Sequence, residues 1–264
     1  MAANGMVNEY SISELMVCVF SRQIQDESVG VMPGVRSEVP LGSACLAARM
    51  HAPDMYVHTV HGDIDPTTLS ISGTTSDYEG SLSSYQIHPL YGLFDMLHHG
   101  DVDWCFYGGM QVDQFANINL NAVGDWQKPK VRGPGSAGGP SENWAKRFMV
   151  WINEHSPRVF MPHVDFVGVP GYEKDREALQ IPGIGPDPIV TPLAVLEVDR
   201  GAGRLAVRSI HSGVGLQEVV DSTGFELIIP DDVPQTDPPT EQELHLLRTE
   251  VDPKGILRKE NRFG

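Results

Sequence analysis

Apolar residues in the first part of the chain alternate between two spacings, one typical of helices and one typical of buried strands. Ser11 and Glu14 have the spacing of a capping box and are followed by apolar residues at helical intervals, which predicts a helix beginning near Ser11. Residues 28–35 form a short apolar run ended by a Pro-Gly turn and predict a strand. A helix with a small-residue face over 41–52 and a β-branched strand over 55–60 repeat this order.

The same alternation continues further along the chain. Residues 89–100 have a helical pattern, residues 102–109 indicate a buried strand, and residues 158–168 and 193–198 predict later strands. Strands that alternate with helices are typical of a parallel sheet covered by helices. The sequence therefore predicts the α/β class, with Gly-rich loops at strand ends, where backbone N–H groups can meet a ligand.

Two stretches interrupt the alternation. Residues 130–144 are dense in Gly and Pro and predict a loop, and Ser141 is placed to cap a helix beginning near Asn143. Residues 229–247 are acidic and Pro-rich and lead into a short terminal helix, which we interpret as a surface arm. The division that we expect is an N-terminal segment over 1–10, one α/β domain over 11–230, and an acidic Pro-rich linker with a C-terminal helical arm over 231–264.

Composition narrows the range of partners and compartments. With 264 residues, of which 41% are hydrophobic, the chain can bury a sizeable core, and its formal charge of -16 disfavours nucleic acid and membrane surfaces as partners. Cys18, Cys45 and Cys105 lie in apolar runs without metal-ligand spacing, which predicts buried free thiols in a reducing compartment. The N-terminus lacks signal-peptide features, and no apolar run approaches the ~20 residues of a membrane span. We therefore expect a cytoplasmic protein.

Histidines and aspartates gather in residues 50–66, around the predicted strand over 55–60. His58 and His61 are three positions apart, so on a strand they point to opposite faces and cannot easily share a metal. We predict no metal site. Two roles stay open for His61: it acts as a base or acid, since its ordinary pKa lies near neutrality, or it points into solvent or caps a turn.

Three motifs lie in the middle of the chain: a Gly-Gly-x-Gln-Val-Asp segment that begins at Gly108, the spaced pair Asn117 and Asn119, and a Gly-rich loop that begins at Gly133. Together they resemble the β-subunit pattern of family I CoA-transferases. The similarity extends over most of the chain between Ser11 and Pro230 and also includes steroid ring-cleaving hydrolases of the same superfamily. One departure is Ala116, where the family usually has Gly before Asn-x-Asn. The motif residues are Gly108, Gly109, Gln111, Val112 and Asp113, then Asn117 and Asn119, then Gly133, Gly135, Gly138 and Gly139.

The resemblance implies a CoA-transferase-like α/β fold, an α-type partner subunit, a CoA thioester of a carboxylated acyl group as substrate, and no bound cofactor. Transferases of this family use a glutamate that attacks the thioester, and aligning residues 52–54 and Gly62 places Val60 at that position. Valine cannot carry an acyl group. We therefore favour a hydrolase or lyase that opens a ring or cleaves a C–C bond. The alternatives are a transferase whose glutamate lies in the partner, or a catalytically silent subunit.

The predicted site combines two candidate catalytic residues, His61 and Arg132, with a set of substrate- or CoA-binding residues. Glycines let a backbone approach the thioester and hold an oxyanion or phosphate, although a plain surface loop has the same composition. Arg132 either binds a substrate carboxylate or enolate or forms a surface salt bridge. The two asparagines are substrate donors or turn formers, whereas we assign Trp104 and Trp126 to the core. The binding set is Gly108, Gly109, Gln111, Asn117, Asn119, Gly133, Gly135, Gly138 and Gly139.

Overall fold

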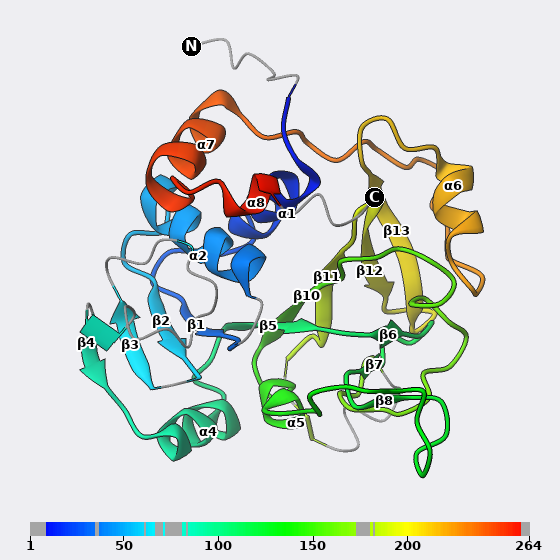
Figure 1. The fold of residues 1–264 in the computed structure, drawn as a ribbon, viewed down its shortest axis with the longest axis horizontal. Helices are drawn as coiled ribbons and strands as arrows, with labels where there is room; N and C mark the ends of the chain where they lie inside the picture. The colour runs from blue at the N-terminus through cyan, green and yellow to red at the C-terminus, as the bar shows by residue number, and fades with distance from the viewer. Residues whose placement is uncertain are drawn as a thin grey trace. The chain divides into compact units, whose positions relative to one another are not determined.

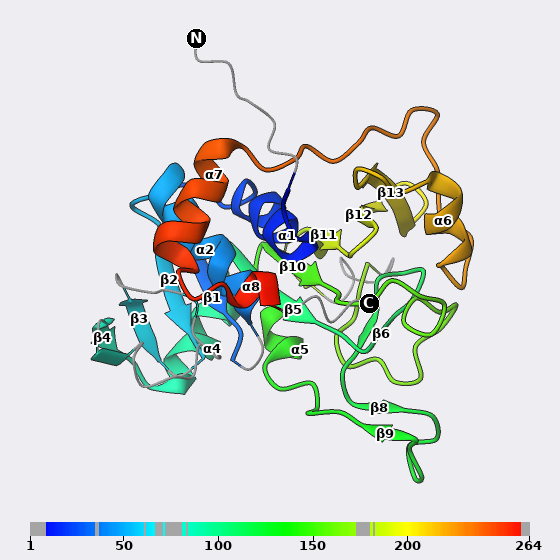
Figure 2. The same ribbon diagram turned by 45° about the horizontal axis from the view of Figure 1, so that its top comes forward.

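The chain folds into two compact units, which are described separately. The first unit comprises Met1–Phe106 and Asp237–Gly264, and the second comprises Tyr107–Thr236. Figures 1 and 2 show the elements of both units. The computed structural model describes residues 9–34, 37–60, 62–66, 71, 81–82, 84–172, 180–181 and 183–259.

The first unit contains a five-membered run of strands with a parallel centre. The order is β5-β1-β2-β3-β4. β1 pairs in parallel with β2 and β5, which confirms the predicted parallel sheet, whereas β2-β3 and β3-β4 are antiparallel. The short link between β2 and β3 forces the reversal, because a parallel neighbour needs a long crossover. The strands are β1 (Val29–Met32), β2 (Tyr56–Thr59), β3 (Asp63–Pro66), β4 (Ser84–Ile87) and β5 (Trp104–Gly108), of which β5 belongs to this unit up to Phe106.

Helices group beside this sheet, and the predicted capping box is present. The Glu14 N–H donates to Ser11 Oγ at 3.1 Å, and the Ser11 N–H donates to Glu14 Oε2 at 2.8 Å. Figures 1 and 2 show α1, α2, α7 and α8 together on one side of the strands. The elements are α1 (Ile12–Ser21), α2 (Glu38–Met50), α4 (Leu90–His99), α7 (Glu241–Leu246), the π-helix η1 (Leu247–Val251) and α8 (Ile256–Lys259).

The C-terminal segment is packed into the first unit from Asp237 onwards. Leu244, Leu247, Val251 and Leu257 are buried. Two ion pairs tie the segment to α1: Arg22 to Glu243 at 2.7 Å, and Arg248 to Glu14 at 2.7 Å. The structure thus divides the chain at Phe106 and Asp237 rather than at residues 10 and 230, and the helices that we interpreted as a surface arm cover an apolar face of α1 and α2.

The second unit combines four strands with two small hairpins. The strand order is β13-β12-β11-β10, with β10-β11 parallel and the other two pairs antiparallel. The hairpins are β6-β7 and β8-β9. The bounds are β6 (Gln111–Val112), β7 (Ile118–Asn119), β8 (Ala122–Val123), β9 (Val131–Arg132), α5 (Gly139–Glu142), β10 (Arg147–Trp151), β11 (Pro186–Val190), β12 (Ala194–Asp199), β13 (Arg204–Ile210) and α6 (Leu216–Asp221).

Two local predictions in this unit are wrong. Residues 158–168 form no strand apart from an isolated bridge between Phe160 and Val112, since Pro162 interrupts the apolar run and lacks an N–H for a ladder. Ser141 caps no helix, because α5 already begins at Gly139 and its N-cap is Gly138. The predicted strand over 193–198 is confirmed as β12, although it runs antiparallel to both neighbours.

The three cysteines are buried thiols that form no disulfide, as the sequence predicts. Burial raises the pKa of the Cys45 thiol to about 12 and also raises that of Cys18 well above its usual range. Neither thiol therefore forms a thiolate near neutral pH. None of the helices among the described residues is long and apolar enough to cross a bilayer.

Candidate functional site

Gln111 and Asn119 face each other across the β6-β7 hairpin and hold their surroundings by hydrogen bonds. Their Cα atoms are ladder partners, and Asn119 Nδ2 donates to Gln111 Oε1 at 2.6 Å and to the Ala122 carbonyl at 2.7 Å. Asn119 Oδ1 accepts from the N–H groups of Asn121 and Ala122 at 2.9 and 3.3 Å. Asn119 is fully buried away from bulk solvent, and these bonds satisfy its side-chain amide within the protein.

The loop between β6 and β7 is closed by Asp113 and Asn117. Asp113 Oδ1 accepts from the N–H groups of Phe115 and Asn117 at 2.9 and 3.0 Å, and Asn117 Oδ1 accepts from the Gly171 N–H at 2.7 Å. Burial raises the pKa of the Asp113 carboxyl, although these hydrogen bonds oppose the shift. Asn117 is therefore a turn former in this structure, and its substrate contact stays a prediction. We call Gln111, Asp113, Asn117 and Asn119 the amide network.

Ala116, at the departure from the family motif, has a left-handed backbone conformation. Its φ is +61° and it is fully buried. This region of φ favours glycine, because a Cβ crowds the backbone there. The glycine that the sequence resemblance leads one to expect at this position thus has a direct physical reason, and this chain accepts local strain instead.

Close packing explains four of the predicted glycines. A Cβ at Gly108 would lie 2.9 Å from Trp151 Cζ2, and one at Gly109 would lie 2.6 Å from Ile118 Cγ2. A Cβ at Gly133 would lie 2.2 Å from the Leu120 carbonyl oxygen. Gly139 is equally tight, since its Cβ would lie 2.4 Å from Val169 Cγ2. These positions let the chain segments of the site approach one another, and a ligand contact at them stays a prediction.

Some backbone N–H groups of the Gly-rich loop donate hydrogen bonds to other parts of the chain. The N–H groups of Gly133, Gly135 and Gly139 donate to carbonyls at 2.8, 3.1 and 2.8 Å. Gly135 has φ +99° and open space beside its Cα, whereas Gly138 has φ -79° and needs no glycine on that ground. Within the described part of the chain, the N–H groups of Ala137 and Gly138 make no hydrogen bond.

Arg132 ends the β8-β9 hairpin, residues 122–132, which we call the Arg132 hairpin. Its side chain is exposed, its guanidinium carbon lies 4.7 Å from the centre of the Trp126 ring, and Nη2 donates to the Trp126 carbonyl at 3.2 Å. Trp126 in turn stacks on Phe166, with ring centres 4.7 Å apart. Among the described residues Arg132 forms no ion pair, so the surface salt bridge that we left open is absent there.

Trp104 is buried as predicted, but the assignment of Trp126 to the core is wrong. Trp126 is 47% exposed because it lies on the Arg132 hairpin rather than under the sheet. Trp104 is 3% exposed and fits above Gly30, where a Cβ would lie 2.0 Å from its ring. The sequence signal for Trp126 is the surrounding Gly-Asp-Trp-Gln-Lys-Pro-Lys stretch, which is polar on both sides.

Val60, which the sequence resemblance aligns with the family's nucleophile, lies in the first unit, at the end of β2. Val60 follows the last strand residue Thr59, and Gly62, at φ +92°, lies so close to His88 that a Cβ would be 1.8 Å from the His88 carbonyl oxygen. Burial lowers the pKa of His58, and nearby His88 lowers it further. His61 lies outside the described residues, so its role stays a prediction.

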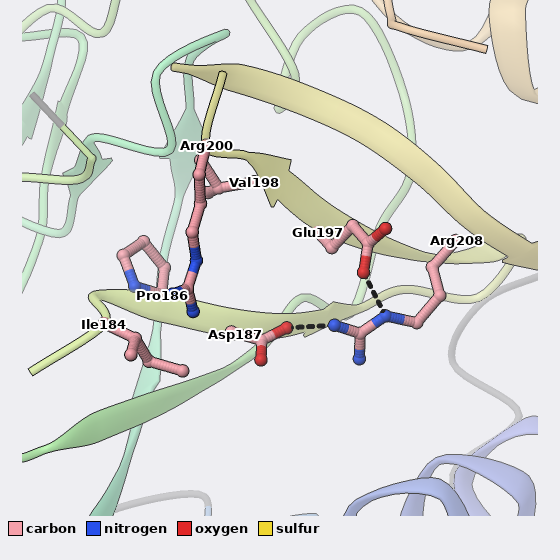
Figure 3. A pocket seen from close by; sticks show the side chains of 7 residues that line it. All are labelled: Ile184, Pro186, Asp187, Glu197, Val198, Arg200 and Arg208. Atoms are coloured by element: carbon pink, nitrogen blue, oxygen red, sulfur yellow. Dashed lines mark hydrogen bonds and ion pairs between the residues drawn. The ribbon is translucent and has the colours of Figure 1, made fainter. Parts of the chain in front are cut away.

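Figure 3 shows a small pocket in the second unit, with a volume of about 80 Å³. Arg208 lies between two carboxylates, bonded to Glu197 at 2.6 Å and also to Asp187. The two acids already balance this guanidinium, and Arg200 is the other cation of the lining. The pocket contains none of the predicted site residues. In the described part of the chain, no cluster of three or more His, Cys, Asp or Glu side chains is arranged to hold a metal ion.

Two features of the second unit were not singled out from the sequence. His155 bridges Thr191 and Thr223 at 2.8 and 3.0 Å, and burial, with nearby His211 as a second cause, lowers its pKa to about 4. Asp165 accepts hydrogen bonds from Gln111 and from the backbone of the Arg132 hairpin. Partners so distant in sequence leave no local spacing signal, so sequence patterns alone could not find either feature.

Comparisons with known proteins identify the family of this chain. The sequence profile of the coenzyme A transferase family matches residues 20–222. The B-type subunit of 3-oxoadipate CoA-transferase from Pseudomonas knackmussii is 32% identical, covering 92% of this chain and 94% of the relative. The IpdB subunit of cholesterol ring-cleaving hydrolase from Mycobacterium tuberculosis is 30% identical, covering 83% of this chain and 86% of the relative.

A solved structure has the same fold as this chain. The crystal structure of glutaconate CoA-transferase from Acidaminococcus fermentans has a TM-score of 0.86 and 26% identity, covering 96% of this chain and 98% of that chain. The predicted α/β, CoA-transferase-like fold is thus confirmed. The family profile and the similarity to the 3-oxoadipate relative both extend over most of the sequence, and so the chain belongs to the coenzyme A transferase family, as a β-type chain of its family I branch.

Proposed function

We propose that this chain is the β-type subunit of a two-subunit enzyme that acts on the CoA thioester of a carboxylated acyl group. The observation that carries the proposal is the state of Arg132: its guanidinium is exposed, rests on an aromatic ring and forms no ion pair among the described residues. In a chain with a formal charge of -16, such a cation is suited to an anionic ligand. The similar relatives are themselves named as subunits, which supports an α-type partner.

The Gly-rich loop supplies the second half of the proposed contact. Arg132 holds the carboxylate or enolate of the acyl group through two parallel N–H donors. The free N–H groups of Ala137 and Gly138 stabilise negative charge that develops on a thioester or ketone oxygen. The buried amide network lies beside this loop and the hairpin and holds both in a fixed position. His61 is the proposed acid or base, and the CoA thioester is the substrate, with no cofactor bound to this chain.

Hydrolysis or lyase chemistry is the reaction class that we favour. A transferase passes the acyl group and then CoA through one carboxylate carrier, and Val60 cannot form either intermediate. In hydrolytic C–C cleavage, water instead supplies a hydroxyl to the carbonyl carbon and a proton to the leaving carbon, so this chain needs no carrier. The named activity of the ring-cleaving relative supports this choice.

Transfer of CoA is the second candidate, and the relative at 32% identity favours it, because it is named as a CoA-transferase subunit. The carboxylate carrier would then lie in the α-type partner. A catalytically silent subunit that only completes its partner is a third candidate. Either subunit role fits a reducing cytoplasm, which we propose on the three buried thiols that form no disulfide.

The distinguishing experiment uses the co-expressed two-subunit complex. Size-exclusion chromatography should show this chain in a hetero-oligomer, and a fully active homo-oligomer would contradict the partner. The complex is then incubated with a series of dicarboxylic acyl-CoA thioesters, with and without acetate, and acetyl-CoA is measured by mass spectrometry. Hydrolase or lyase chemistry predicts products that do not depend on acetate. Acetate-dependent acetyl-CoA would instead establish transfer.

A further inference from the structure

Asp165 links the buried amide network to the exposed Arg132 hairpin. One carboxylate oxygen, Oδ2, accepts from Gln111 Nε2 at 2.8 Å and from the Gly124 N–H at 2.8 Å. The Asp165 N–H returns a bond to Gln111 Oε1 at 3.1 Å. Gln111 is 2% exposed, whereas Asp165 itself is exposed. One exposed carboxylate therefore fixes the start of the hairpin to a buried, rigid amide.

The residue after Asp165 supports the aromatic ring on which Arg132 rests. Phe166 stacks on Trp126 at an interplanar angle of 20°, and the Arg132 guanidinium lies over the same Trp126 ring. Gly124, which donates to Asp165, has φ +88° and lies two positions before Trp126. The segment 165–166 thus holds the hairpin at two points, by a hydrogen bond to its backbone and by a ring stack.

We propose that Asp165 is a positioning residue for Arg132. It sets the hairpin and its tryptophan so that the guanidinium is already ordered when the anionic end of the acyl-CoA arrives. An exposed arginine otherwise loses several rotamers on binding, and preorganisation removes part of that loss. The inference rests on the proposed function, because it takes Arg132 as the substrate anchor.

The role assigned to Asp165 depends on its acceptor oxygen and not on its charge. Asp165→Ala removes the acceptor for Gln111 and Gly124. Asp165→Asn keeps one carbonyl oxygen that can accept both bonds but removes the negative charge. Rescue by Asn therefore separates positioning from a direct electrostatic part in binding.

The test measures the Kd of glutaryl-CoA for the two-subunit complex by calorimetry, with butyryl-CoA as the probe that lacks the distal carboxylate. Arg132→Ala should weaken glutaryl-CoA binding by about 30-fold or more. Asp165→Ala should weaken it by about 5- to 10-fold, the effect of ordering one or two long side chains. Asp165→Asn should stay within about 3-fold of the original protein. Butyryl-CoA binding should change little in all three.

The double variant carries the decisive comparison. If Asp165 acts through Arg132, then adding Asp165→Ala to Arg132→Ala should weaken binding no further. Additive losses, an unchanged Kd in Asp165→Ala, or failure of Asn to rescue would each overturn the positioning role while leaving the proposed function intact. An unchanged Kd in Arg132→Ala would instead overturn the anchor of the proposed function, and this inference with it.

A matched control and a second readout guard against a general folding defect. Asp199 also accepts a backbone N–H in a hairpin, from Ala202 at 2.7 Å, and Asp199→Ala should leave glutaryl-CoA binding unchanged. The second readout is acrylamide quenching of the fluorescence of Trp126, which is isolated by subtracting the signal of a Trp126→Phe variant. Quenching should increase in Asp165→Ala and return to the original value in Asp165→Asn. Unchanged quenching in Asp165→Ala would show that the hairpin does not depend on this carboxylate.

Discussion

The amide network and the Arg132 hairpin lie beside each other in the second unit, yet they use polar side chains in opposite ways. Gln111 and Asn119 are buried at 2% and 0% exposure, and their hydrogen-bonding groups are occupied by the protein. Arg132 is exposed and has one backbone carbonyl and one aromatic ring as partners. The same motif region thus separates into a buried hydrogen-bonded network and an exposed hairpin.

The comparison teaches that residue type alone does not identify a binding residue. An amide whose donors and acceptors are all satisfied gains little by turning to a ligand, because leaving its buried partners unpaired costs about 1–3 kcal/mol each. An exposed guanidinium loses no such partner. We therefore expect changes in the network to lower stability and changes at Arg132 to lower activity.

The largest expected effect is on stability, from Asn119→Ala. The change leaves the N–H groups of Asn121 and Ala122 without their side-chain acceptor and removes one of the two donors to Gln111 Oε1. We expect the free energy of unfolding to fall by about 3–5 kcal/mol, measured by urea denaturation. A loss below about 1 kcal/mol would show that water replaces these bonds and that the network is not a rigid base.

The next effect is on catalysis, from Arg132→Ala in the two-subunit complex. Loss of a charge-assisted contact to an anion should reduce kcat/KM by about 30-fold or more, equivalent to about 2–5 kcal/mol. The free energy of unfolding should change by no more than about 1 kcal/mol, since the residue is exposed. Arg158→Ala is the matched control, because Arg158 is an exposed arginine of the same unit that pairs with Glu154. Unchanged kcat/KM would move the anchor to Lys130 or to the partner.

A third prediction extends the comparison to the buried histidines. The pKa of His155 is about 4 in the folded chain and 6.5 as its ordinary value. The folded state therefore binds fewer protons than the unfolded state between these two pH values. The contribution of neutral His155 to the free energy of unfolding is complete above about pH 6.5 and is lost as the pH falls towards 4. The loss should be on the order of 3 kcal/mol, seen as a pH-dependent urea midpoint.

The control for the pH prediction removes the titrating group. His155→Gln can still bond to Thr191 and Thr223, so it should retain much of the fold while making stability less dependent on pH in this window. The same slope in both proteins would mean that His155 is not responsible for it.

The smallest expected effect is a gain in stability, from Ala116→Gly. Ala116 has φ +61°, and relief of this strain should outweigh the greater freedom of glycine in the unfolded chain by about 0.5–1 kcal/mol. Gly135→Ala is the opposite change at φ +99° and should destabilise by about 1 kcal/mol although its Cβ meets open space. If neither change alters the free energy of unfolding, the backbone relaxes at both positions and the positive φ stores no strain.

Local periodicity predicted much of the fold. The capping box at Ser11, the helix ending at Gly100 and the parallel β1, β2 and β5 were all visible in the sequence. The antiparallel flanks were not, because strand direction depends on the length and course of connections. The burial of the C-terminal helices was also missed, since an acidic, Pro-rich approach resembles a solvated arm while the apolar face of the helix finds α1 and α2 only in three dimensions.

The candidate site was predictable only in part. The Gly-rich loop and Arg132 follow from composition, and Gly135 has a positive φ, a backbone conformation that favours glycine. The burial and internal hydrogen bonds of Gln111 and Asn119 do not follow, because their partners include Asp165 and the backbone at Ala122. The exposure of Trp126 was missed for a different reason. Large aromatic residues are buried on average, whereas this one lies exposed on a hairpin.

The proposed reaction class depends most directly on the end of β2. The two-subunit complex is incubated with glutaryl-CoA, treated with borohydride, digested, and the peptide spanning residues 50–66 is analysed by mass spectrometry. Because Val60 cannot form an acyl or CoA ester, we predict that this peptide carries no reduced or CoA-derived adduct. A modified carboxylate within this segment, for instance at Asp63, would contradict the account and identify this chain as the carrier subunit of a CoA-transferase.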